Sequence, residues 1–144
     1  MDQRQAQASA DTDRPLPVPT PESMPYWEAA REHRLIVQRC TECGLTQFYP
    51  PRVFCRRCMS ELKWIECSGK GVVFASSTVV RAPSPSFAAD APYNVSMIEL
   101  EEGIHLISNI VNPPSEGEAK IGAAVEVVFD DVTESVTLPK FRLV

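Results

Sequence analysis

Four cysteines in one short stretch are the residues of this chain best suited to chemistry. They form two C-x-x-C pairs, Cys40 with Cys43 and Cys55 with Cys58, which eleven residues separate. Two such turns joined by a hairpin bring four sulfurs together tetrahedrally, the arrangement that zinc prefers. Iron in the same four-sulfur cage is the alternative that the spacing leaves open. A thioredoxin-type redox motif would need a single C-x-x-C between a strand and a helix, which is missing here.

A metal held by four thiolates has a closed coordination shell, so it supports folding and leaves no position for a substrate. A ribbon of about 30 residues has too small a core to fold unaided, and the metal supplies the missing stability. The arginines near the cysteines have two candidate roles. They offset the negative charge of a metal–thiolate centre, or they contact a partner or a phosphate. These arginines are Arg39, Arg52, Arg56 and Arg57.

The remaining reactive side chains do not form a catalytic set. Cys67 precedes a turn, where we expect a small buried side chain at a strand end. His33 lies at the end of a predicted helix and His105 begins a predicted strand, and we expect both at the surface. The sequence contains no G-x-S-x-G, no glycine-rich phosphate loop and no H-E-x-x-H. We therefore predict no catalytic residue, and no catalysis by this chain alone.

The segments before and around the cysteines predict a helix and a ribbon. Residues 1–20 are polar and then proline-rich, which predicts a disordered tail. Residues 21–34 predict a short helix that Thr20 caps and that docks by Trp27. Residues 35–66 predict the metal ribbon, whose extended segments are residues 35–39, 46–54 and 62–67.

Residues 67–144 predict a barrel of five strands. Val, Ile and Thr dominate these segments, as half-buried pleated strands favour. A short turn at residues 101–103 joins the second and third strands, with glycine placed for positive φ. A longer connection at residues 112–122 follows the third strand, which is the layout of an OB-fold. The predicted strands are residues 71–81, 93–100, 104–111, 123–131 and 135–144.

Charge and composition argue against two classes of function. Residues 31–64 carry seven basic and three acidic side chains, whereas residues 65–144 carry five basic and eleven acidic ones. An OB-fold that binds single-stranded nucleic acid needs a basic groove and stacking aromatics on its second and third strands, and both are missing here. No segment approaches the roughly 20 apolar residues of a membrane helix, and the N-terminus has no secretory signal. We therefore expect the protein in the cytoplasm, where disulfides are rare.

Several motifs in a fixed order carry a family resemblance, which runs from about residue 21 to the C-terminus. Trp27 is followed by LIVQRCTECG, FYPPRVFCRRC, W-x-E-x-SGKG, PYNVSMIELEEG and a closing LPKF. This order resembles the acyl-CoA-associated proteins with a rubredoxin-like zinc ribbon and an OB-fold, long catalogued as a domain of unknown function. The resemblance implies a helical segment, then the ribbon, then the barrel. It also implies that the four cysteines are the metal ligands.

The same resemblance implies a partnership. Such proteins are similar to non-catalytic subunits of thiolase-fold enzymes that make or break carbon–carbon bonds in acyl-CoA substrates, including the retro-aldol cleavage of steroid side chains and acyl transfer. A MaoC-like enoyl-CoA hydratase is a further partner in some relatives. This chain has no room for a hydratase domain, so we expect a separate subunit of a hetero-oligomer. Two alternatives stay open: a nucleic-acid-binding module of zinc ribbon and OB-fold, and a free-standing acyl-CoA-binding protein.

Exposed aromatic side chains beside arginines would favour an interface with such a partner. For Trp64 we expect packing between ribbon and barrel instead. The loop of residues 82–93, predicted to lack secondary structure, is expected to lie against the partner or the pantetheine arm of CoA. The aromatic candidates are Phe48, Tyr49, Phe54, Trp64 and Phe141. The weaker candidates for CoA or partner contact are Arg52, Arg81 and Tyr93.

Overall fold

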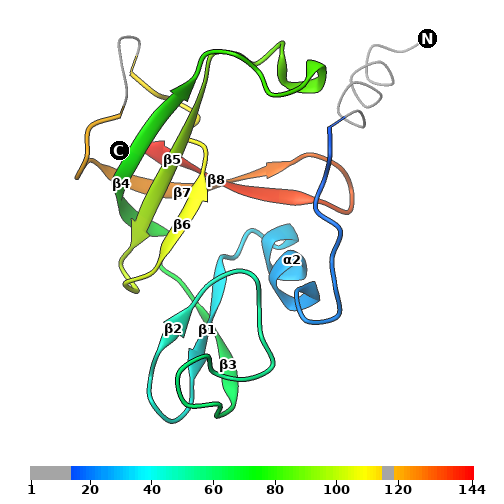
Figure 1. The fold of residues 1–144 in the computed structure, drawn as a ribbon, viewed down its shortest axis with the longest axis vertical. Helices are drawn as coiled ribbons and strands as arrows, with labels where there is room; N and C mark the ends of the chain where they lie inside the picture. Colours follow the sequence, from blue (N-terminus) through cyan, green and yellow to red (C-terminus); the bar gives the residue numbers. More distant parts are fainter. Residues whose placement is uncertain (1–13, 115–118) are drawn as a thin grey trace.

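The computed structural model describes residues 14–114 and 119–144, which form two antiparallel sheets and one α-helix (Figure 1). The ribbon sheet has the strand order β2-β1-β3, and the larger sheet has the order β6-β5-β4-β7-β8. This is the predicted mainly β fold, with a short helix, a ribbon and a five-stranded sheet. The elements are α2 (Met24–Arg31), β1 (Ile36–Cys40), β2 (Thr46–Gln47), β3 (Leu62–Glu66), β4 (Lys70–Val79), η1 (Pro85–Phe87), β5 (Tyr93–Leu100), β6 (His105–Ser108), β7 (Ala124–Asp131) and β8 (Thr137–Leu143).

The five-stranded sheet curls until its two edges meet. A parallel bridge joins Ile110, just after β6, to Phe141 in β8. The N–H of Phe141 donates to the carbonyl of Asn109 at 2.9 Å, and the N–H of Val111 donates to the carbonyl of Phe141 at 2.8 Å. A curled five-stranded sheet whose third and fifth strands meet in this way is consistent with an OB-fold.

Phe141 lies at this closure and is 0% exposed. The prediction that it belongs to an exposed aromatic surface is therefore wrong. Its neighbours in the core include Val125 and Ile110, which are also buried. A large aromatic side chain placed where two edges meet fills the barrel and holds the closure together by burial.

Strand β5 shows why the barrel sequence folds as predicted. Buried and half-buried residues alternate strictly along it, because successive side chains of a strand point to opposite faces. At one end the inward side chains are Ile98 and Leu100, which are fully apolar. At the other end, the buried Asn94 Oδ1 accepts hydrogen bonds from the hydroxyl of Ser96 at 2.7 Å and the N–H of Ile110 at 3.1 Å. This amide therefore supports the closure of the barrel.

Two glycines in the barrel have distinct roles. Gly103 has a φ of 84°, which confirms the predicted hairpin turn between β5 and β6. In β4, a Cβ at Gly71 would lie 2.4 Å from the carbonyl oxygen of Glu99 on the neighbouring strand. Only glycine lets β4 and β5 approach this closely at that point.

Helix α2 packs against both β1 of the ribbon and β8 of the barrel (Figure 1). It begins at Met24, after a turn in which Thr20 and Ser23 exchange hydrogen bonds between each N–H and the other's hydroxyl, at 2.8 and 3.2 Å. Trp27 is partly buried and packs against the core, as predicted, and the neighbouring Tyr26, which is 6% exposed, is the more deeply buried aromatic side chain of the helix.

His33 connects the end of this helical segment to the barrel. Its imidazole stacks on Phe129 with ring centroids 5.1 Å apart. Its Nε2 lies 3.0 Å from a carboxylate oxygen of Asp131, which also accepts the hydroxyl of Thr137 at 2.7 Å. The Thr137 hydrogen bond and, second, the contact with His33 lower the pKa of Asp131. The histidine is exposed, as predicted, and it has a structural contact.

The predicted disordered tail falls mostly outside the described residues, which begin at Arg14. The guanidinium of Arg14 contacts the loop of residues 82–92: its Nε donates to the carbonyl of Ser86 at 3.1 Å, and an Nη lies 2.6 Å from Asp90. That loop contains the 3₁₀ turn η1, so the prediction that it lacks secondary structure is wrong. The predicted connection at residues 112–122 includes residues 115–118, which lie outside the described residues. No described helix is long and apolar enough to span a membrane.

Candidate metal centre

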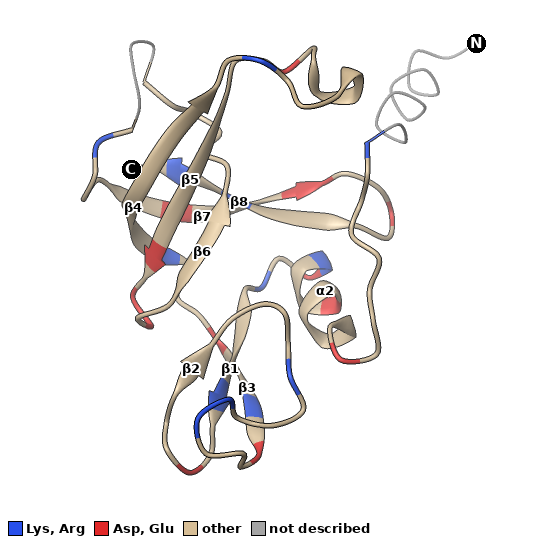
Figure 2. Cartoon of the chain, in the orientation of Figure 1, with Lys and Arg blue, Asp and Glu red and all other residues tan. Residues whose placement is uncertain are grey.

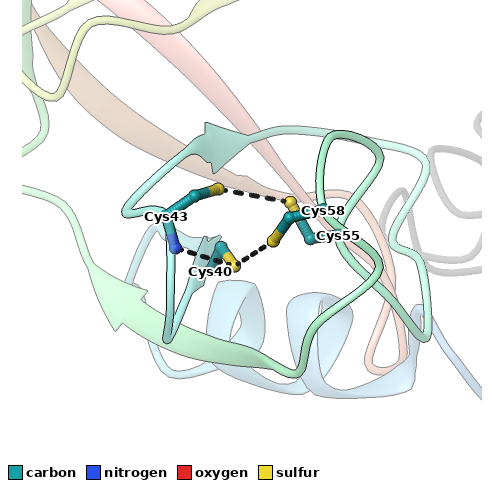
Figure 3. A group of neighbouring side chains, drawn as sticks. All are labelled: Cys40, Cys43, Cys55 and Cys58. Carbon is teal, nitrogen blue, oxygen red and sulfur yellow. Dashed lines mark hydrogen bonds between the residues drawn. The ribbon is translucent and has the colours of Figure 1, made fainter.

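The four predicted ligand cysteines meet in the ribbon (Figure 3). All four sulfurs lie within 4.8 Å of one another. The Sγ atoms of Cys40 and Cys58 are 3.4 Å apart, and those of Cys43 and Cys55 are 3.6 Å apart. A tetrahedral zinc ion with Zn–S bonds of about 2.3 Å would hold its sulfurs about 3.8 Å apart. The arrangement therefore fits one metal ion bound by four thiolates.

Two matching turns aim the sulfurs inward. After Cys43, Gly44 has a φ of 72°, as its place in the sequence predicts for a tight turn. After Cys58, Met59 occupies the equivalent position with a φ of 63°. A non-glycine residue rarely adopts this left-handed conformation, so the second turn stores about 1 kcal/mol of strain that metal binding and local hydrogen bonds offset.

Backbone N–H groups stabilise the thiolates. The N–H groups of Glu42 and Cys43 point to the Sγ of Cys40, and that of Arg57 points to the Sγ of Cys55, all at 3.4 Å. Hydrogen bonds from Cys58 and Arg57 lower the pKa of Cys55. Amides aimed at sulfur favour the ionised form that binds metals.

The pKa values of the two exposed cysteines, Cys58 and Cys43, are shifted in opposite directions. Hydrogen bonds from the hydroxyl and N–H of Ser60 lower the pKa of Cys58 to about 6. A backbone N–H of Leu45 acts in the same direction on Cys43, yet desolvation and neighbouring thiols together raise the pKa of Cys43 to about 11. Four thiols this close do not all ionise without a cation among them, and a coordinated dication would deprotonate all four.

The polypeptide between the cysteine pairs is held by two buried glutamines. The side chain of Gln38 (6% exposed) donates to the carbonyl of Arg52 at 2.8 Å and accepts the N–H of Arg52 at 2.9 Å. Gln47 (4% exposed), directly opposite Gln38 in the β1–β2 register, accepts the N–H of Arg56 at 3.4 Å. The predicted strand of residues 46–54 is limited to Thr46–Gln47. After Gln47, the side chains of Gln38 and Gln47 form the hydrogen bonds to the loop backbone that a neighbouring strand would otherwise form.

The structure separates the other candidate contact residues. Arg52 is exposed on the ribbon, whereas Arg81 and Tyr93 flank the loop of residues 82–92 at the far end of the barrel (Figure 1). Arg81 is exposed, and the half-buried Tyr93 packs against Phe87 with ring centroids 6.2 Å apart. Tyr93 and Phe87 line a cavity of about 540 Å³ at the mouth of the barrel. These three candidates therefore do not form one site.

The other reactive groups stay apart from the cysteine cluster. Cys67 is buried as predicted, and burial followed by the charge of Glu102 raises its pKa to about 12, so it remains a neutral thiol. His105 is exposed, stacks on Phe74 and bonds to Glu99 at 2.8 Å. Within the described parts of the chain, no nucleophile, base and oxyanion site converge.

Sequence reasoning missed the residues that hold the ribbon loop. Gln38 and Gln47 lie in strand-like segments, where a polar residue is normally assigned to the solvent side. The pairing of two inward glutamines becomes visible only once the β1–β2 register is known. The positive φ of Met59 could not be predicted from the sequence either, because methionine is an unusual residue at a left-handed position. An imperfect C-x-x-C-G repeat is the one hint: Gly44 follows the first pair, and Met59 follows the second.

A four-cysteine ribbon followed by a curled five-stranded sheet defines the class of zinc-ribbon and OB-fold proteins. Two family models match: "ChsH2, rubredoxin-like zinc ribbon domain" over residues 27–62 and "ChsH2, C-terminal OB-fold domain" over residues 64–130. A DUF35 domain-containing scaffold protein of Methanocaldococcus jannaschii is 40% identical over 111 residues, which are 75% of this chain and 77% of that protein. The chain belongs to this family, the ChsH2-type DUF35 proteins.

A longer relative and two solved structures are also similar to this chain. A protein of Thermomonospora curvata named "Probable enoyl-CoA hydratase alpha subunit" is 34% identical over 119 residues, which are 81% of this chain and only 36% of that protein. The solved structure of an Ltp2-ChsH2(DUF35) aldolase contains a chain with a TM-score of 0.77 and 31% identity, covering 88% of this chain and 98% of that one. A DUF35 protein of unknown function from Sulfolobus solfataricus, at 16% identity, 86% coverage of both chains and a TM-score of 0.58, shares the fold.

Proposed function

We propose that this chain is a non-catalytic, zinc-containing subunit that binds and supports a thiolase-fold enzyme acting on acyl-CoA substrates. The observation that carries the proposal is the structural match to the ChsH2(DUF35) chain of an aldolase, which extends over nearly all of that chain at 31% identity. Relatives named scaffold proteins support the same role. The partner's reaction in this proposal is carbon–carbon bond formation or retro-aldol cleavage. The particular cases that we propose are the cleavage of steroid side chains and acyl transfer.

The metal in this proposal is zinc, with a structural role. Four sulfurs at tetrahedral spacing and amides directed at them support it. Zinc supplies folding stability there, and iron is the alternative that metal analysis of the purified protein decides. Four thiol ligands must stay reduced to bind the metal, so we propose that the subunit works in the cytoplasm.

The partners in this proposal are proteins that handle acyl-CoA. A thiolase-fold enzyme is the first, in a hetero-oligomer. A MaoC-like enoyl-CoA hydratase is the second, which the name and greater length of the Thermomonospora curvata relative support. The loop of residues 82–92, with Arg81 and Tyr93 beside it, is proposed to lie against the partner or the pantetheine arm of CoA. Deleting residues 84–90 tests this, because an unchanged complex and activity would contradict it.

Affinity capture of the tagged chain from its native host at moderate salt, followed by mass spectrometry, tests the proposal. A thiolase-fold protein bound in stoichiometric amount is the expected result. Recovery of the chain alone, or with nucleic acid, would overturn it. Titration of the pure chain with CoA and with single-stranded DNA then separates the two alternatives, an acyl-CoA carrier and a nucleic-acid-binding module.

A further inference from the structure

The ribbon loop exposes an unusual group of side chains, which we call the 52–59 surface. Three arginines and three apolar residues are exposed there, and Cys55 and Cys58 among them direct their sulfurs to the four-cysteine cluster. The apolar members have large exposed fractions: 63% for Val53, 50% for Phe54 and 69% for Met59. Aromatic residues, methionine and arginine are the types that protein interfaces concentrate. The complete set is Arg52, Val53, Phe54, Arg56, Arg57 and Met59.

Within the part of the chain that the structure describes, the arginine side chains of the 52–59 surface have no bonding partner. Among residues 14–114 and 119–144, no side chain forms an ion pair or hydrogen bond with the guanidinium of Arg52, Arg56 or Arg57. The N–H groups that donate to cysteine sulfur in the described residues belong to the backbone, and none belongs to these guanidinium groups. In Figure 2 the ribbon backbone is coloured blue at several Lys and Arg positions. Three positive charges therefore remain available to an acidic partner.

The exposure of these side chains comes from a fixed backbone. Gln38 holds Arg52 through both its N–H and its carbonyl, and Gln47 accepts the N–H of Arg56. Cys55 adds two backbone bonds, to Ser60 and from Met59, both at 2.9 Å. A loop held in this way cannot turn its apolar side chains inward. Little ordering entropy is lost when a partner binds such a preorganised surface.

The surface also contains a hollow. Phe54 and Met59, together with the acidic Glu42 and Glu61, line an open depression of about 690 Å³ that reaches the exposed cysteines Cys43 and Cys58. An apolar side chain seated there would contact Phe54 and Met59 and cover the two sulfurs from water. Docking at this position would therefore slow the escape of the metal.

We propose that the 52–59 surface is the docking site for an acidic patch with an apolar centre on the thiolase-fold subunit. This inference rests on the proposed function. A second copy of the chain is a weaker occupant, because a ribbon-to-barrel contact would be head-to-tail and would continue into filaments. Nucleic acid is disfavoured, because Phe54 is the single aromatic ring of the 52–59 surface, which leaves no row of rings for successive bases.

Variants of the full zinc-loaded chain test the docking site against the captured thiolase-fold protein. We expect Arg56→Glu with Arg57→Glu to raise the Kd about 100-fold and to remove most of its salt dependence. Phe54→Ala should raise the Kd about 10- to 30-fold. The matched control changes Lys120→Glu and Ile121→Ala, an exposed pair on the barrel, and should leave the Kd within about twofold. Unfolding midpoints and zinc content confirm that each variant is folded.

Release of zinc to a chromogenic chelator gives a second readout, which needs no activity. The partner should slow release from the wild-type chain at least about tenfold and leave release from the charge-reversed variant unchanged. If the wild-type chain captures no thiolase-fold protein, the proposed function itself fails. If it captures one and the 52–59 variants behave like the control, only the docking site is wrong. Self-association or single-stranded DNA binding that Phe54→Ala abolishes, with partner affinity intact, would overturn the proposal in favour of that occupant.

Discussion

The two buried glutamines of the ribbon allow a matched test of what fixes the loop between the cysteine pairs. Gln38 and Gln47 face each other across β1 and β2 and are almost equally buried. Gln38 makes two short hydrogen bonds to Arg52, whereas Gln47 makes one long bond to Arg56, and its buried Nε2 has no partner among the described residues. Methionine has nearly the volume of glutamine and makes no such bonds. We expect Gln38→Met to destabilise the protein and Gln47→Met to be nearly neutral.

The magnitudes follow from the bonds lost. Each of the two bonds to Arg52 contributes about 1 kcal/mol net, and the freed backbone groups remain partly buried, so Gln38→Met should cost about 2–3 kcal/mol. For Gln47→Met, one weak bond is lost and one buried unsatisfied N–H disappears, so the change should stay within about 1 kcal/mol. A difference of about 2 kcal/mol between the two variants is therefore expected.

Urea unfolding at fixed free zinc, followed by tryptophan fluorescence, measures this difference. The chain has two tryptophans, Trp27 in α2 and Trp64 in β3, so the signal reports the helix and the ribbon. Fixed zinc is required because metal binding adds to the apparent stability. Equal losses for both variants would show that volume and packing set the cost. A Gln38→Met variant as stable as the wild type would refute the proposed restraint on the loop.

Three further predictions address the metal, the strained turn and the barrel contact. Cys55→Ser, or removal of the metal by a chelator, should expose the amides of the ribbon to hydrogen exchange while those of β5 stay protected, because the metal replaces a core that the ribbon lacks. Met59→Gly should raise the free energy of unfolding by about 0.5–1 kcal/mol, because its φ of 63° suits glycine and its side chain is exposed; a loss of stability would show that the thioether packs. The pKa of Asp131 is lowered in the folded state, so its contribution is present above its unfolded pKa and is lost as pH falls through the folded value. The stability gap between wild type and Asp131→Asn should thus shrink below about pH 4 in acid unfolding curves, and a constant gap would contradict the assignment.

The barrel was predictable because its strands obey local rules. Strand β5 spans the predicted residues 93–100, since a barrel strand alternates between core and surface. The hairpin at Gly103 was predictable for the same reason, because a positive φ calls for glycine. The four cysteines were equally clear, since their spacing alone brings the sulfurs together. In each case the signal lies within a few neighbouring residues.

The parts that failed depend on contacts between distant residues. The segment 46–54 has the composition of a strand, but Pro50 and Pro51 lack the N–H groups of a ladder, and Gln38 from another strand holds the backbone that follows. Phe141 was assigned to the surface because it lies near the C-terminus. In the structure β8 pairs with the residues after β6, and this contact buries Phe141. Neither register nor closure is encoded locally, so composition alone assigned these residues to the wrong environment.

Metal binding and partner docking are expected to be linked, because both depend on one loop. A metal bound by the four cysteines would fix Cys55 and Cys58, and the exposed residues of the 52–59 surface lie between and beside them. If the loop loses its fixed conformation when the metal leaves, the partner must supply the ordering entropy and binds more weakly. Linkage then requires that the partner raise the affinity for zinc by the same factor. Measuring both factors on the same complex closes the cycle. Equal factors well above one would establish the zinc ribbon as a support for docking, and factors of one would show that the metal stabilises the chain without shaping the surface.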